Sequence, residues 1–340
     1  MLSTCVIIPA AGSGSRLGGG EPKAFAHIHG RSLLARSLET IISSGVATTV
    51  VVAAPEDFLL RAREEIDSVT ERMNTSIPIT AVAGGKDRTA SVQIALKHVS
   101  NAEVVLVHDA ARCLTPPDVF RRVHAAVLSG AEAVVPVLPM IDSVRRAVVH
   151  PATGSSTTAG DDTGVDRTSD GIVRSIRRDS VAETTVDRPN NSDPAAVVGT
   201  AGSYAVVRGD LDRAHLRRVQ TPQGFRAETL LRAYDHHVTD DVVTAEGDVS
   251  GEDLDAVRAA VPTDDAGLVE RLGVEVVAVA GDEEALKITY PLDRILGEHL
   301  ARLRDADTDS GRSGGSGSSE SSGTSRNGET SGSGTEGDPR

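Results

Sequence analysis

Several short runs of this sequence are apolar at every or nearly every position, and these runs constrain the fold most strongly. Residues 5–10 read Cys-Val-Ile-Ile-Pro-Ala, and residues 49–54, 104–108 and 133–137 are comparably rich in apolar side chains. A half-exposed antiparallel strand alternates apolar and polar side chains, whereas a strand covered on both faces does not. These runs therefore predict buried strands of a mostly parallel sheet.

Helical patterns fill the intervals between these strands. Leu33, Leu34, Leu38, Ile41 and Ile42 recur at the spacing of one helix face. Further elements follow in the same alternation: helices over residues 56–73, 89–98, from near residues 116–117 onward and 291–303, and strands over residues 79–83 and 273–279. The alternation predicts a doubly wound, Rossmann-like α/β fold. In such a sheet the ligand lies at the carboxyl ends of the strands.

Composition separates one globular domain, residues 1–304, from stretches of different character. Residues 305–340 are mostly Gly and Ser, and Ala306 is their only apolar side chain, so we expect a disordered tail. Residues at about 151–200 are rich in Thr, Ser, Asp and Gly, and those at about 240–261 are strongly acidic. We expect both to be flexible insertions in the domain.

A different pattern appears just before the first insertion. Residues 143–149 read Ser-Val-Arg-Arg-Ala-Val-Val, an alternation that suits an exposed strand. We expect this stretch to form a protruding β-arm.

The charge and the cysteine content exclude several classes of protein. A net charge of −14 argues against a general nucleic-acid surface, which needs clustered Lys and Arg. Cys5 and Cys113 are too few for a disulfide framework or a zinc site of the usual spacing. No apolar run reaches the length of a membrane span. We expect a cytoplasmic protein that binds neither nucleic acid nor membrane.

A glycine-rich loop follows the first predicted strand. Residues 11–20 hold five glycines, and a loop of this kind exposes backbone N–H groups to phosphate oxygens. The loop lacks the Gly-Lys-Ser/Thr ending of a P-loop, and Leu17 occupies the position of the third Gly of a dinucleotide-binding motif. It instead offers Arg16, with Lys23 shortly after, as two cations for a triphosphate. The alternative is a plain tight turn with solvated cations.

Two further motifs lie at predicted strand ends. Asp109 directly follows the strand at 104–108 and is a candidate contact for Mg²⁺ or a nucleotide, although a helix-capping role fits as well. Gly84, Gly85 and Ser91 lead from a strand into a helix, whose N-terminus favours an anion or a base carbonyl. Ser91 could equally be a simple capping residue.

Taken in order, these motifs and three later ones resemble one enzyme family. The later motifs are Thr-Pro-Gln-Gly-Phe at 221–225, Thr-Asp-Asp at 263–265 and Lys-Ile-Thr at 287–289. The whole set resembles the 2-C-methyl-D-erythritol 4-phosphate cytidylyltransferases. The resemblance implies a nucleotidyltransferase of non-mevalonate isoprenoid synthesis. With Mg²⁺, the phosphate of the polyol attacks the α-phosphorus of CTP, giving 4-diphosphocytidyl-2-C-methyl-D-erythritol and pyrophosphate.

The resemblance also implies roles for particular residues. The catalytic residues it implies are Arg16, Lys23, Arg213 and Lys287. The residues around CTP are Ala10, Ala11, Gly12, Gly14, Gly85, Arg88, Ser91, Asp109 and Ala110, and Asp109 is also the implied metal ligand. The residues toward the polyol phosphate are Arg112, Ser143, Thr221 and Thr263. The arm is expected to mediate a homodimer and to bring Ser143 to the substrate of the partner subunit.

The sequence departs from the family pattern at a few positions. Ala285 stands where the family usually has Asn, and Cys113 where Pro is common. The Asp-Arg signature occurs twice, ending at Arg188 and at Arg213, and only Arg213 has the family's spacing to the motif at 221–225. We therefore predict Arg213 as the residue that positions the substrate phosphate.

Two alternative functions are kept. The first is a cytidylyltransferase for another polyol phosphate, such as ribitol 5-phosphate. The second is a catalytically degenerate binding protein, which Ala285 and the extensions suggest. The presence of Arg16, Lys23, Asp109 and Lys287 argues against the second.

Overall fold

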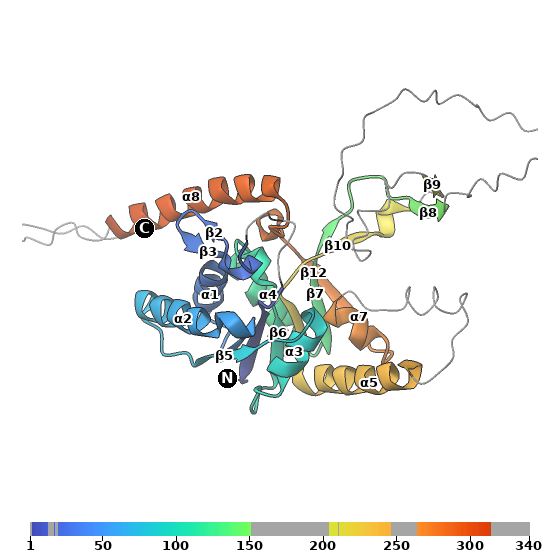
Figure 1. Cartoon of the computed structure of the whole chain (residues 1–340), viewed down its shortest axis with the longest axis horizontal. Helices are drawn as coiled ribbons and strands as arrows, with labels where there is room; N and C mark the ends of the chain where they lie inside the picture. Colours follow the sequence, from blue (N-terminus) through green and yellow to red (C-terminus); the bar gives the residue numbers. More distant parts are fainter. Residues whose placement is uncertain are drawn as a thin grey trace, which may run out of the picture. The chain divides into compact units, whose positions relative to one another are not determined.

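The computed structural model describes residues 2–12, 17, 20–150, 204–209, 211–245 and 264–313 (Figure 1). The chain divides into two compact units. The first consists of residues 1–137 and 219–340, and the second of residues 138–218.

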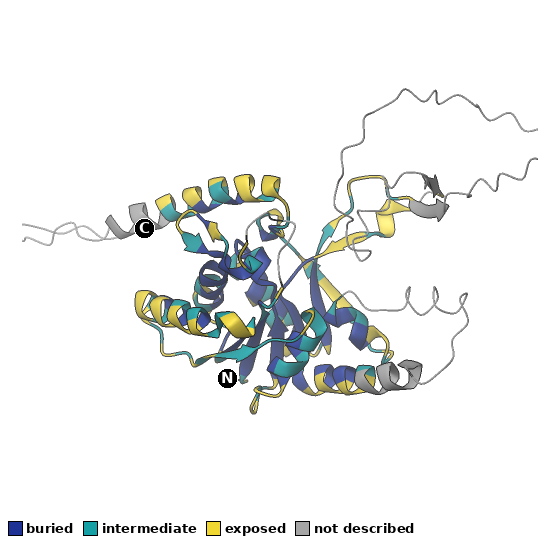
Figure 2. Ribbon diagram, viewed as in Figure 1, coloured by how far each residue is buried: buried dark blue, intermediate teal, exposed yellow. Residues whose placement is uncertain are grey.

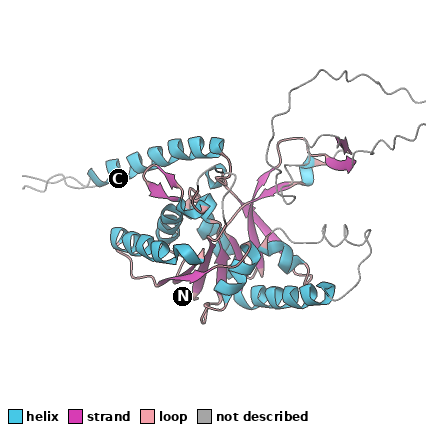
Figure 3. Cartoon of the chain, viewed as in Figure 1, coloured by secondary structure: helices cyan, strands magenta, loops and turns pink. Residues whose placement is uncertain are grey.

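The first unit is built on a mostly parallel sheet with helices on both faces (Figure 3). The strands, in the order of the sheet, are β10 (Arg217–Val219), β7 (Ala133–Pro139), β11 (Gln223–Arg226), β6 (Val104–Val107), β1 (Thr4–Pro9), β4 (Thr49–Ala54) and β5 (Ile79–Ala83), and β12 (Val276–Ala280) pairs with β7. The helices are α1 (Leu33–Ser44), α2 (Leu59–Met73), α3 (Arg88–Leu96), α4 (Pro117–Leu128), α5 (Ala227–Ala245), α7 (Asp265–Glu270) and α8 (Pro291–Ser313). The predicted doubly wound fold is confirmed.

The central strands β1, β4 and β6 are buried along nearly their whole length (Figure 2), and their side chains pack on both faces of the sheet. In β1, Val6 and Ile8 pack with α1, α2 and α4, whereas Cys5 and Ile7 pack with α3, α5 and α7. The strand is therefore apolar at consecutive positions because both faces are covered. Individual helix ends also follow from the sequence: the Ser32 hydroxyl caps α1, and Gly45 ends it with a left-handed φ of 71°.

The order of the strands places a ligand site at one edge of the sheet. From β1 the chain moves outward through β4 to β5 and then returns to the other side of β1 with β6. The strand order thus reverses between β1 and β6, and a crevice forms outside the carboxyl ends of strands at such a point. Gly12 of the glycine-rich motif follows β1 and Asp109 follows β6, so both belong to this crevice.

Two strands of the sheet, β10 and β11, were not predicted. Residues 223–226 were interpreted only as part of a polar motif, but β11 pairs antiparallel with both β6 and β7. Gly224 is required there because a Cβ would lie 2.5 Å from Val123 Cγ1. The side chain of Phe225 in the same strand is fully buried.

The second unit contains the alternating stretch. Strand β8 (Arg146–His150) pairs antiparallel with β9 (Tyr204–Arg208), so the end of this stretch forms a strand, as its alternation predicts. A short 3-10 helix, η6 (Arg213–His215), follows. Most of the predicted insertion at 151–200 lies outside the described residues.

Helix α5 runs into the region predicted as the second insertion. Helix α5 continues to Ala245, past position 240, so the acidic residues at 240 and 241 belong to a helix. Residues 246–261 of this insertion lie outside the described part of the chain. Within the part that is described, no helix combines the length and apolar character needed to cross a membrane.

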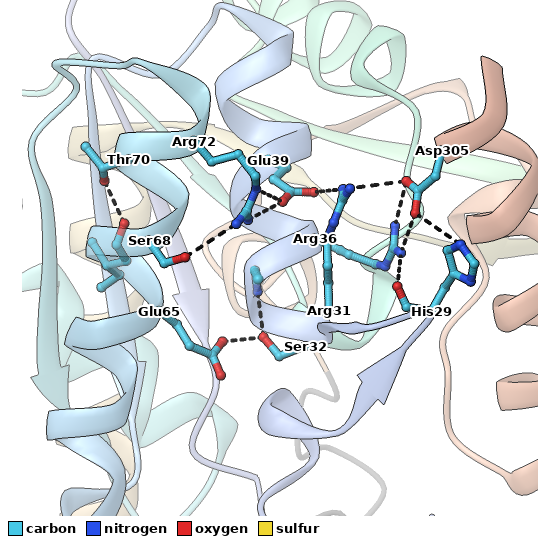
Figure 4. Close-up of polar contacts among 12 residues, drawn as sticks. His29, Arg31, Ser32, Arg36, Glu39, Glu65, Ser68, Thr70, Arg72 and Asp305 are labelled. Carbon is cyan, nitrogen blue, oxygen red and sulfur yellow. Dashed lines mark hydrogen bonds and ion pairs between the residues drawn. The ribbon is translucent and has the colours of Figure 1, made fainter. Parts of the chain in front are cut away.

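The predicted start of the C-terminal tail is wrong. Helix α8 extends to Ser313 rather than ending at Leu303. Asp305 accepts a hydrogen bond of 2.9 Å from Nη2 of Arg36, whose side chain is 5% exposed (Figure 4). Arg36 also donates to the carbonyls of Ile28 and His29, next to the β2 (His27–Ile28) and β3 (Arg31–Ser32) hairpin. A polar residue in a Gly/Ser-rich stretch thus becomes part of the fold by pairing with a buried cation.

Truncation of the chain tests this boundary. Removing residues 305–340 leaves the Arg36 guanidinium without its carboxylate, at a cost of about 2 kcal/mol for a charged hydrogen bond. We expect the melting temperature to fall by about 5 °C for a domain of this size. Removing only residues 314–340 should leave it unchanged. Equal melting temperatures for the two truncations, measured by calorimetry, would contradict this account.

The stability contributed by the pair of Arg36 and Asp305 is expected to depend on pH. Burial alone would raise the pKa of Asp305, but Arg36 outweighs burial and holds it below the ordinary 3.8. A carboxylate with a depressed pKa stabilises the fold above its unfolded-state pKa and loses that contribution as the pH falls. We expect the difference in melting temperature between wild type and Asp305→Asn to be full at neutral pH. It should shrink below about pH 3.8.

Candidate active site

A cavity of about 350 Å³ lies in the first unit, where residues following β1 and β6 meet. Its wall consists of small residues and a few charged ones: Pro9, Ala10, Ala11, Gly12, Lys23, Ala24, Arg88, Ser91, Asp109, Ala110, Ala111, Lys287 and Thr289. Because so many of these side chains are small, a ligand can approach the backbone closely. The described residues of its wall include three cationic side chains and one carboxylate, so the cavity suits an anionic ligand.

Lys23 reaches the cavity from the end of the glycine-rich loop. The backbone N–H of Lys23 donates to the carbonyl of Gly12 at 3.4 Å, which closes the loop, and η2 (Lys23–Phe25) begins at the same residue. The Nζ of Lys23 donates to Thr289 Oγ1 at 3.3 Å. The first and last motifs of the sequence therefore meet on one wall of the cavity.

Asp109 lies between two of the cations. Its carboxylate accepts from Arg88 Nε at 3.0 Å and pairs with Lys287 Nζ at 2.8 Å. Burial alone would raise the pKa of Asp109, but the charges of Arg88 and Lys287 outweigh burial and hold the pKa far below its usual range. The carboxylate is therefore ionised at neutral pH.

Thr221 binds the backbone N–H of Asp109, and His108 in turn binds Thr221. The N–H of Asp109 donates to Thr221 Oγ1 at 3.1 Å, and the same hydroxyl is hydrogen-bonded to His108 Nδ1 at 3.1 Å. Burial lowers the pKa of His108 to about 3, so the imidazole is neutral. Thr221, predicted to contact the substrate, is itself buried with its hydroxyl engaged in these bonds, and it is not part of the cavity wall.

The turn before α3 shows why its glycines are needed. A Cβ on Gly84 would lie 2.6 Å from the Ala11 Cβ, and one on Gly85 would lie 2.5 Å from the Ala90 Cβ. The buried Ser91 hydroxyl accepts from Gly85 N at 3.1 Å and donates to Asp87 O at 2.7 Å. Gly85 thus shapes the turn behind the wall, whereas Ser91 both braces the turn and lines the cavity.

Arg112 holds the segment that precedes Lys287. Its Nη1 donates to the carbonyl of Ala285 at 2.7 Å, and Ile288 N donates to Ala111 O at 2.8 Å. Ala285 itself is fully buried at the end of η7 (Glu283–Ala285). The backbone carbonyl at 285 thus anchors the segment although the Asn typical of the family is missing. The wall of the cavity does not include Arg112.

Cys113 occupies the position where Pro is common in the family, in a cluster with Leu33, Leu114 and Ile288. Burial raises the pKa of its thiol to about 12. A protonated, enclosed thiol is chemically inert.

The structure brings together most of the predicted nucleotide-binding residues with two of the predicted catalytic ones. The nucleotide-binding residues that line the cavity are Ala10, Ala11, Gly12, Arg88, Ser91, Asp109 and Ala110, and the catalytic ones are Lys23 and Lys287. Gly14, Arg16, Thr263 and Arg188 lie outside the described residues. Ser143 and Arg213 belong to the second unit, where Ser143 is exposed and Arg213 Nη1 donates to Ile141 O at 2.6 Å.

Some residues of the site were given no role from the sequence. Thr289, Pro9, Ala24 and Ala111 line the cavity, and each belongs to or adjoins a motif already recognised. Asp265 belongs to the Thr-Asp-Asp motif and accepts a hydrogen bond from Arg88 without lining the cavity itself. Its position in that motif was the signal that could have identified it.

Comparisons with known proteins agree with the motif pattern. A sequence profile of the 2-C-methyl-D-erythritol 4-phosphate cytidylyltransferases matches residues 4–210 and 198–302. A relative of that name from Rhodococcus opacus is 36% identical over 294 residues, covering 86% of this chain and 93% of the relative. One from Saccharopolyspora erythraea is 37% identical over 301 residues, covering 87% and 98%. The crystal structure of the enzyme from Thermus thermophilus superimposes with a TM-score of 0.52 at 26% identity, covering 89% of this chain and all of that one.

Proposed function

Because the chain belongs to the family of 2-C-methyl-D-erythritol 4-phosphate cytidylyltransferases, we propose that it transfers the cytidylyl group of CTP to this polyol phosphate. The products are 4-diphosphocytidyl-2-C-methyl-D-erythritol and pyrophosphate, in the non-mevalonate route to isoprenoid precursors. The observation that carries the proposal is the cavity at the β1–β6 edge, where Lys23, Arg88, Asp109 and Lys287 meet among small residues.

The reaction requires two anions to meet. An oxygen of the polyol phosphate attacks the α-phosphorus of CTP, a new P–O bond forms, and the bond from the α-phosphorus to the bridging oxygen breaks with release of pyrophosphate. Negative charge is redistributed over the phosphoryl oxygens, and fixed cations stabilise it best where they need no rearrangement. Lys23 and Lys287 line the cavity and supply such charges, and Arg16 is proposed to join them.

The small residues of the wall are proposed to surround the nucleotide. Ala10, Ala11, Gly12 and Ala110 leave the backbone open to the base and phosphates, and Ser91 lies beside them. Small side chains at these positions allow the base to be recognised by backbone groups rather than by long side chains. Gly14 and Gly85 are proposed to shape the loops on either side of the nucleotide.

The donor set of the cavity fits Mg²⁺. This ion is usually held by one or two carboxylates together with substrate phosphates, and Asp109 provides an ionised carboxylate on the wall. No cluster of three metal-ligating side chains occurs among the described residues, so the nucleotide is proposed to supply the other ligands. Bound there, Mg²⁺ would neutralise phosphate charge.

The remaining parts of the proposal concern the polyol phosphate and the assembly. Arg213, Arg112 and Thr263 are proposed to bind the substrate phosphate, whereas Thr221 is proposed only to support Asp109. The arm is proposed to form a homodimer in which Ser143 serves the partner's site. A cytoplasmic location and the absence of nucleic-acid and membrane partners complete the proposal.

Product identification tests the function directly. The purified chain is incubated with CTP, Mg²⁺ and methylerythritol phosphate, and the products are identified by mass spectrometry and pyrophosphate release. The same mixture with an equal concentration of ribitol 5-phosphate distinguishes the two polyol substrates. Preferential cytidylylation of ribitol phosphate, or no pyrophosphate release with either polyol, would contradict the proposal.

The two Asp-Arg signatures give a sharp test of the substrate residue. A bidentate arginine on a phosphate must be held in place through the transition state, and only Arg213 has the family's spacing to the motif at 221–225. We expect Arg213→Ala to raise KM for methylerythritol phosphate and to lower kcat, with Arg188→Ala nearly unchanged. Steady-state kinetics of both variants check this, and the reverse ranking would assign the role to Arg188.

A further inference from the structure

Asp265 is a fully buried carboxylate that the proposed chemistry leaves unused. It begins helix α7, and none of its side chain is exposed to solvent. It is also absent from the wall of the cavity, so a ligand there does not touch it. An ion in such a position is costly unless it is paired and hydrogen-bonded.

The partners of Asp265 connect it to the cavity. Its Oδ2 accepts from Arg88 Nη2 at 2.6 Å, and its Oδ1 accepts from the Tyr234 hydroxyl at 2.6 Å. The same guanidinium donates Nε to Asp109 Oδ1 at 3.0 Å. A continuous chain of hydrogen bonds therefore runs from the core helix α5 through α7 and α3 to the carboxylate on the cavity wall.

Each hydrogen bond in this series has a defined donor and acceptor. Tyr234 is 3% exposed, and burial together with the charge of Asp265 raises the pKa of its hydroxyl, so the hydroxyl stays protonated and donates. Asp265 offers both oxygens as acceptors, and the planar guanidinium donates Nη2 to Asp265 and Nε to Asp109. Rotating Arg88 toward one carboxylate would break its bond to the other.

We propose that Asp265, itself held by Tyr234, is a positioning residue that fixes Arg88 and through it Asp109 for binding CTP. The inference rests on the proposed function, because Arg88 and Asp109 are its nucleotide-binding residues. A purely structural ion pair could be replaced by other buried groups with little consequence for ligand binding. A positioning residue instead changes the affinity of a site that it does not touch.

The test measures CTP affinity by titration calorimetry, with Mg²⁺ present, together with kcat and KM. Asp265→Asn keeps the size of the side chain and removes its charge, and we expect the Kd for CTP to rise about tenfold with kcat changed less than about threefold. Tyr234→Phe should raise the Kd about threefold. Glu132→Gln is the matched control, because Glu132 accepts a hydrogen bond from the hydroxyl of Thr229, which lies on the same helix α5 as Tyr234. The Glu132→Gln variant should bind CTP as the wild type does.

A double-mutant cycle separates positioning from an independent effect. If Asp265 acts through Arg88, Arg88→Ala combined with Asp265→Asn should bind CTP no more weakly than Arg88→Ala alone. The inference would be overturned if the increases in Kd of the two single variants multiplied in the double variant. It would also be overturned if a folded Asp265→Asn variant bound CTP with wild-type affinity. If Asp265→Asn fails to fold, wild-type affinity in Tyr234→Phe overturns it instead. Turnover by the wild-type chain tests the proposed function separately, so the two can fail independently.

Discussion

Replacing Lys23 with alanine is expected to lower kcat by a hundredfold or more while the affinity for CTP changes less. Lys23 lines the cavity, and its Nζ is held at 3.3 Å from Thr289 Oγ1. A cation placed where charge develops acts mainly in the transition state, and removing one such group costs about 3 kcal/mol. Single-turnover kinetics of pyrophosphate release, with CTP at saturation, measure the effect on the chemical step.

Lys97→Ala is the matched control for this prediction. Lys97 is an exposed lysine at the end of α3 and does not line the cavity. It carries the same charge, so a general electrostatic effect of the acidic protein would appear in both variants. We expect wild-type kcat in the control. A Lys23→Ala variant with near wild-type kcat would remove Lys23 from the catalytic residues.

The second large effect is expected for Asp109→Asn, with kcat/KM for CTP reduced about a hundredfold to a thousandfold. The substitution keeps the size of the side chain but removes the only carboxylate among the described residues of the cavity wall. A hard cation prefers a charged oxygen ligand, so the Mg²⁺ concentration needed for half-maximal activity should rise as well. Activity measured across Mg²⁺ concentrations, and CTP titrations with and without Mg²⁺, check both effects.

Asp118→Asn provides the control for Asp109→Asn. Asp118 lies in the first turn of α4 with its side chain 70% exposed, and it pairs with Arg121 three residues later. Exposed pairs of this kind contribute little to stability, so we expect wild-type activity and wild-type Mg²⁺ dependence. An Asp109→Asn variant whose Mg²⁺ dependence matches that of the control would exclude Asp109 as the metal-binding residue.

The sequence carries enough information for the fold class and for most of the cavity. The apolar runs that become β1, β4 and β6 are local patterns, and a strand buried on both faces admits no polar interruption. The motif residues follow these strands directly. Once the strands are parallel, Gly12 and Asp109 must emerge at the same edge, and both do line the cavity.

Residues in contact across long sequence separations could not be predicted in the same way. Strand β11 is only four residues long, and its place between β6 and β7 depends on partners about 120 and 90 residues earlier in the chain. Asp305 looks like a tail residue by composition, but Arg36 lies 269 residues away and pairs with it. Composition describes neighbours along the chain, whereas these contacts are made between neighbours in space.

The sequence alone therefore determined the alternation of strands and helices, the edge of the sheet that binds ligand, and the chemical types of residue placed there. These properties depend on local periodicity and on the geometry common to parallel sheets. Only the tertiary structure decided that Thr221 binds the backbone of Asp109 and that Asp265 binds the guanidinium of Arg88. A hydrogen bond has a reach of about 3 Å, so which polar groups meet depends on how distant segments pack.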